Sequence, residues 1–97
     1  MTLPKSGSRS VLVDNRPHRF KVTRGEDTSL RVIIEDEEHP GHFILALFDH
    51  RRCPGVGPAD VVAFVRYARQ AGWRPQLMGN FAMGDHAVDE ALNTIGR

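Results

Sequence analysis

The chain has 97 residues, of which 40% are hydrophobic and 26% are charged, and its formal net charge is +1. This composition is typical of one globular domain and excludes disordered, collagen-like and fibrous chains. No apolar run approaches the roughly 20 residues of a membrane helix, and the first residues lack the hydrophobic core of a secretory signal peptide. The single cysteine, Cys53, forbids an intramolecular disulfide, so we expect a reducing, cytoplasmic setting.

The first half of the chain is predicted to form β-strands. Residues 1–10 are mostly small or polar and are expected to be a flexible tail, ahead of a single domain over residues 11–97. Apolar and basic side chains alternate over residues 18–23, which is the period-two pattern of a strand with one buried face. Four strands are predicted in all, over residues 11–13, 18–23, 30–35 and 43–48.

The fourth predicted strand differs from the others because both of its faces are apolar. One face carries Phe43, Leu45 and Leu47, and the other carries Ile44, Ala46 and Phe48. A strand of this kind is usually covered on both sides. The row of residues 44, 46 and 48 is expected to need more cover than a short C-terminal helix provides, so a twofold homodimer is predicted.

Two helices are predicted in the second half of the chain. Pro58 suits the first position of a helix, Gly72 suits its end, and apolar side chains recur between them at helical spacing. A shorter helix is predicted to begin with Asp85 as its N-cap, and residues 76–78 could add a short strand. The fold class is therefore α+β: a four-stranded antiparallel meander with one long helix packed on it and a short C-terminal helix.

The predicted long helix starts at a proline and is followed by a Gly-Trp-x-Pro sequence. The residues that carry this pattern are Pro58, Val61, Ala68, Gly72, Trp73 and Pro75. They resemble a pattern in small, mostly uncharacterised bacterial proteins, including some from mobile gene cassettes. The resemblance implies a small α+β domain and no particular activity. Trp73 is expected to be buried against the helix, because it is the largest apolar group available to close that end.

Four residues have the spacing of metal-ligand pairs: His39 with His42, and His50 with Cys53. The strand predicted between the pairs would span about 26 Å at ~3.3 Å per residue, whereas ligands of one tetrahedral ion lie ~4 Å apart. One site cannot hold all four, so no cofactor is predicted. His39 and His42 are the weak candidates for a metal site.

Cys53 follows His50, Arg51 and Arg52, so nearby positive charge could favour its reactive thiolate. Cys53 and His50 are therefore the weak candidates for catalysis. A lone cysteine is more often a small buried hydrophobe, and the sequence lacks the cysteine loop of phosphatases. An enzyme that depends on cysteine or metal is the third hypothesis for function.

Opposite charges are separated along the chain. Residues 1–24 contain six Lys and Arg residues against Asp14, and residues 25–50 contain seven Asp and Glu residues against Arg31. A basic strip for phosphates is the nucleic-acid hypothesis, with the candidate residues Arg16, Arg19, Lys21, Arg24, Arg51 and Arg52. It ranks second because nucleic-acid modules usually add exposed aromatic residues for stacking.

No complete set of catalytic residues occurs in the sequence. The first hypothesis is therefore a small noncatalytic binding or accessory module that acts through protein contacts. A homodimer and a separate protein partner are its expected partners, and no membrane contact is expected.

Overall fold

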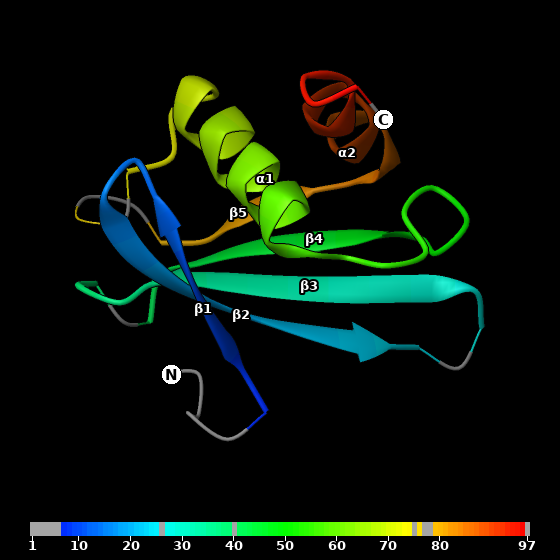
Figure 1. Ribbon diagram of the computed structural model, residues 1–97, viewed down its shortest axis with the longest axis horizontal. Coiled ribbons are helices and arrows are strands. Elements are labelled where there is room, and N and C mark those ends of the chain that lie inside the picture. The colour runs from blue at the N-terminus through cyan, green and yellow to red at the C-terminus, as the bar shows by residue number, and fades with distance from the viewer. Residues whose placement is uncertain (1–6, 26, 40, 75, 77–78, 97) are drawn as a thin grey trace.

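A computed structural model describes residues 7–25, 27–39, 41–74, 76 and 79–96 of the chain. These residues form five strands in one sheet, in which strands that follow one another along the chain are neighbours (Figure 1). The strands are β1 Arg9–Val13, β2 Arg16–Arg24, β3 Ser29–Asp36, β4 Phe43–Asp49 and β5 Phe81–Met83. Two helices complete the fold: α1, Pro58–Gln70, lies between β4 and β5 in the chain, and α2, Asp85–Asn93, follows β5.

The α+β class is confirmed, but the predicted four-stranded antiparallel meander is wrong. The sheet is mixed: β1 to β4 pair antiparallel, whereas β5 pairs parallel with β4, with Phe81 opposite Ile44. The connection through α1 explains the parallel pair, because it returns the chain to the end of the sheet at which β4 begins. The short strand expected at residues 76–78 does not match β5: residue 76 lies in a turn, and residues 77–78 lie outside the described residues.

The sequence analysis expected one long helix packed on the sheet with a short C-terminal helix; this is corrected, because the two helices have 13 and 9 residues and both pack on the sheet. At the start of α1, Asp60 Oδ2 accepts a hydrogen bond from the Gly57 N–H at 2.8 Å, as a third helical residue does in a capping box. The helix ends at Gln70, two residues earlier than predicted. Gly72 then adopts a φ of +109°, which favours glycine and turns the chain out of the helix.

Both helices pack on the same face of the sheet, which we call the inner face (Figure 1). Alternate residues of each strand point to this face and join the helices in one core. Trp73 is 0% exposed, which confirms its predicted burial. Other large members of the core are Val13, Phe20, Val32, Ile34, Ile44, Phe48, Val61, Phe64, Val65, Met83, Val88 and Leu92.

The opposite, outer face of the sheet has no helix of the described chain packed on it (Figure 1). The sequence analysis expected Ile44, Ala46 and Phe48 to be the row in need of further cover, and this is wrong because all three are buried on the inner face. The other row faces outward: Leu45 is 37% exposed and Leu47 is 48% exposed.

The segment expected to be a flexible tail, residues 1–10, is only partly described. Residues 1–6 lie outside the described residues, and β1 begins within the segment, at Arg9. Across the described residues, no helix has both the length and the apolar character needed to cross a membrane.

Candidate functional site

A pocket of about 370 Å³ opens where the last turn of α1 and the loop after it meet the start of β2. Arg16 comes from β2, Arg69 comes from α1, and Arg74 comes from the loop. The described residues that line the pocket are Arg16, Arg69, Gln70, Trp73, Arg74 and Gln76. Three guanidinium groups therefore face one small space, and none of these lining residues is acidic. We call this site the arginine pocket.

Arg16 is held in place by a buried carboxylate. Its Nε and Nη2 atoms donate hydrogen bonds to Asp36 Oδ2 at 3.2 Å and 2.9 Å. Burial alone would raise the pKa of Asp36, but the Glu38 N–H and the Arg16 guanidinium together hold it below its usual value. Asp36 is 0% exposed, so this ion pair fixes Arg16 from the protein side and leaves the solvent side open. The exposed Glu38 lies farther from Arg16, at 3.8 Å.

Arg69 is positioned by a buried histidine. The His18 Nδ1 atom lies 3.0 Å from the Arg16 carbonyl oxygen, and its Nε2 atom lies 3.2 Å from Arg69 Nη2. Burial lowers the pKa of His18. The neutral ring then donates from Nδ1 to the carbonyl and accepts at Nε2 from the guanidinium. His18 thus orients Arg69 without adding another positive charge.

The third cation, Arg74, is tied to the end of α1. Its Nη1 atom donates to the carbonyl oxygens of Arg69 and Trp73, both at 2.9 Å. A positive side chain is favourable there because the last carbonyl groups of a helix lack partners within it. Each of the three guanidinium groups has its own hydrogen-bonded anchor, and Asp36 Oδ2, the anchor of Arg16, also lies 3.9 Å from Arg69 Nη2.

The outer face of the sheet is a second candidate surface. Lys21, Ile33 and Leu45 lie opposite one another on three neighbouring strands, and Arg31 lies opposite Leu47. Within the described part of the chain, Lys21 and Arg31 form no ion pair, whereas Arg19 contacts Glu37 at 3.3 Å. The face therefore combines an apolar strip, made of Ile33, Leu45 and Leu47, with a basic border, made of Lys21 and Arg31.

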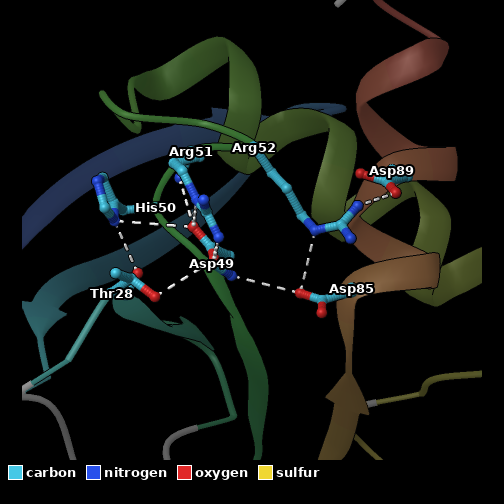
Figure 2. A network of polar contacts seen from close by, with 7 residues as sticks. All are labelled: Thr28, Asp49, His50, Arg51, Arg52, Asp85 and Asp89. Atoms are coloured by element: carbon cyan, nitrogen blue, oxygen red, sulfur yellow. Dashed lines mark hydrogen bonds and ion pairs between the residues drawn. The ribbon is translucent and has the colours of Figure 1, made fainter.

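A polar network joins the end of β4 to the start of α2 (Figure 2). Arg51 binds both carboxylate oxygens of Asp49, at 3.0 Å and 2.7 Å, and these hydrogen bonds hold the pKa of Asp49 far below its usual value. Arg52 contacts Asp85 at 3.3 Å and also binds Asp89. These contacts attach α2 to the sheet and occupy both arginines with carboxylates of the same chain.

The six residues proposed for a basic strip are divided among three places. Arg19 and Lys21 share the outer face, whereas Arg16 and Arg24 have the opposite orientation along β2 and belong to the inner face. Arg51 and Arg52 lie in the network beyond β4. Side chains along a strand alternate between faces, so the strand places only two of the six together.

The weak metal and catalytic candidates are also dispersed. Among the described residues, no group of three or more His, Cys, Asp or Glu side chains is arranged to hold a metal ion. His50 Nδ1 lies 2.9 Å from the Thr28 carbonyl oxygen, and His39 Nδ1 lies 3.8 Å from Asp36 Oδ2. Cys53 is 1% exposed, with its Sγ atom 3.7 Å from the Gly55 carbonyl oxygen. A thiol this deeply buried has no direct access to a substrate.

The sequence analysis singled out Arg16 but missed the other members of the arginine pocket. His18 and Arg69 are 51 positions apart, so no local motif links them. One signal was present: His18 lies two residues before Phe20, and that spacing directs it to the buried face of the predicted strand.

Comparisons with known proteins do not identify this arrangement. No protein-family model matches the sequence, and neither a curated protein nor a solved structure is significantly similar to the chain.

Proposed function

We propose that the protein is a noncatalytic binding module that acts through protein contacts, and that the outer face of the sheet binds a second copy of the chain. The observation that carries this proposal is the uncovered apolar strip of Ile33, Leu45 and Leu47 beside the basic border. An apolar centre with a charged margin is the usual composition of a protein interface, and dimer interfaces are its more apolar form.

The charges of the outer face favour a particular dimer geometry. A twofold axis parallel to β4 would place the apolar strip of one copy on that of the other. In each copy the basic border lies to one side of the apolar strip, toward β2 and β3. Rotation about this axis would therefore place the borders of the two copies at opposite sides of the interface. Like charges would then avoid one another, as an interface between identical surfaces requires.

The test is the mass of the protein in solution. Sedimentation velocity between 5 and 200 µM is expected to give a dimer for the natural chain and a monomer for Leu47→Lys. The matched control is Ile95→Lys, because Ile95 is a similarly exposed apolar residue, at 40%, and follows α2 rather than lying on the sheet. A natural chain that remains monomeric at 200 µM, or a dimer that survives Leu47→Lys, would contradict the proposal.

A nucleic-acid-binding module is the second candidate, because Arg19, Lys21 and Arg31 share the outer face. It predicts that the chain binds a short DNA or RNA probe with an affinity that falls steeply with salt. Binding that disappears in the double variant Arg19→Glu with Lys21→Glu would overturn the preference for protein contacts. The cytoplasmic location and the resemblance to small bacterial proteins stay predictions beside both candidates.

A further inference from the structure

The arginine pocket lies on a different part of the molecule from the outer face and has a different chemistry. Arg16, Arg69 and Arg74 bring three positive charges to a space of about 370 Å³. A buried carboxylate beside them, Asp36, pairs with Arg16 and lies 3.9 Å from Arg69 Nη2. Burial lowers the pKa of Arg69, repulsion from Arg16 adds to this effect, and the attraction of Asp36 opposes it. The charged forms of neighbouring arginines are stabilised when an anion binds between them.

The pocket also contains hydrogen-bond donors that the described chain does not use. Arg69 Nε is buried and has no hydrogen-bond partner within the described part of the chain. Arg16 uses Nε and Nη2 on Asp36, and Arg74 uses Nη1 on carbonyl oxygens. Each guanidinium has five N–H groups, so donors remain on all three. An oxyanion in the pocket would supply acceptors for the donors that remain on the solvent-facing edges of the three guanidinium groups.

The supporting side chains make these donors rigid. Asp36 fixes Arg16, the neutral His18 ring fixes Arg69, and the end of α1 fixes Arg74. A site whose groups are already ordered loses less side-chain entropy on binding. From the charge, the unused donors and the rigid anchors, we infer that the arginine pocket binds a small molecule through a doubly charged oxyanion, either a phosphate or a dicarboxylate.

Size and charge limit the ligand class. A volume of about 370 Å³ lies near the lower end of the range for small-molecule sites, roughly 300 to 1,000 Å³. Planar guanidinium groups form paired hydrogen bonds with both phosphate and carboxylate oxygens. The chemistry that both ligand classes share is therefore a compact dianion, and the titrations described next distinguish phosphates from dicarboxylates.

The test is a titration of the full chain, in separate arms, with inorganic phosphate and with malonate at constant ionic strength set by NaCl. The single Trp73 lines the pocket, and its indole N–H donates to the Gly79 carbonyl oxygen at 3.2 Å, so its NMR signal reports binding. We expect a saturable shift of this signal with at least one anion and a rise in melting temperature, since a ligand that binds the folded state stabilises it.

Substitutions at the pocket give the decisive comparison. Arg69→Gln and Arg74→Gln are each expected to weaken binding by about tenfold or more, the usual effect of losing a charge-assisted hydrogen bond. Arg66→Gln is the matched control, because Arg66 lies on the same helix but pairs with Asp14 at 2.9 Å. Arg74 is exposed, so Arg74→Gln keeps the test valid if Arg69→Gln fails to fold.

The outcomes separate this inference from the proposed dimer. Saturation by phosphate alone assigns the ligand class as phosphates, and saturation by malonate alone assigns it as dicarboxylates. Anion effects no larger than those of chloride, or equal binding by Arg74→Gln and the natural chain, would refute the site. Leu47→Lys should bind the anion normally, because it alters only the outer face.

Discussion

Replacing Trp73 by alanine should remove one of the largest contributions to the stability of this fold. Trp73 is 0% exposed and packs directly after the helix, where its backbone N–H, which alanine would keep, donates to the Ala68 carbonyl oxygen at 2.9 Å. An aromatic side chain buries roughly 150 to 250 Å², which at ~25 cal/mol per Å² is about 4 to 6 kcal/mol. The alanine methyl group and residual burial in the unfolded chain reduce this figure, so we expect a loss of about 3 to 5 kcal/mol.

The assay is urea unfolding followed by far-ultraviolet circular dichroism, because the substitution removes the only tryptophan. A domain of this size is stable by only about 5 to 15 kcal/mol, so the transition of Trp73→Ala should move to much lower urea. Trp73→Phe separates packing from hydrogen bonding. It keeps a large ring and loses only the bond to the exposed Gly79 carbonyl, which water can replace.

We expect Trp73→Phe to lose about 1 to 2 kcal/mol, the combined effect of a smaller ring and a missing hydrogen bond. Ile95→Ala serves as the control, because its side chain is 40% exposed and surface changes usually alter stability by at most about 0.5 kcal/mol. A loss of less than about 1 kcal/mol for Trp73→Ala would refute the argument from burial.

Three further predictions concern the arginine pocket and the end of α1. Asp36→Asn should lower the free energy of unfolding by about 1.5 to 3 kcal/mol, because Arg16 loses its buried charged acceptor. Glu38→Gln, at the exposed partner of Arg16, should change the free energy of unfolding by less than about 1 kcal/mol. The midpoints of urea unfolding compare the two variants. The lowered pKa of His18 means that the unfolded chain binds a proton there more readily than the folded chain. Stability should therefore fall as the pH drops below about 6.5, and melting curves of His18→Gln should lack that component. Gly72→Ala should cost about 1 kcal/mol or more, because φ is +109° there while no described atom lies within 4 Å of an added Cβ; an unchanged melting temperature would contradict this reasoning.

Local patterns in the sequence were sufficient to predict the four antiparallel strands, the two helices and the burial of Trp73. The alternation over residues 18–23 has the repeat of a strand, and Pro58 and Gly72 mark the limits of a helix to within two residues. These signals work because backbone geometry sets the spacing of side chains on each face. They also placed Arg19 and Lys21 on the same face of β2.

The fifth strand and the orientation of β4 depended on the tertiary structure. β5 has only three residues, too few for a clear repeat, and it runs parallel to β4 because α1 returns the chain across the sheet. β4 is apolar on both faces, so its sequence does not distinguish the buried row from the exposed one. The packing of both helices on one face decided that Ile44 is buried and Leu47 is exposed.

The arginine pocket also depended on contacts between distant parts of the chain. Arg16 meets Asp36 from 20 positions away, and His18 meets Arg69 from 51 positions away. Periodicity reports only which face of its own element a residue occupies. The partner on that face is fixed when the elements pack, so the sequence determined that His18 points inward, and only the tertiary structure placed Arg69 beside it.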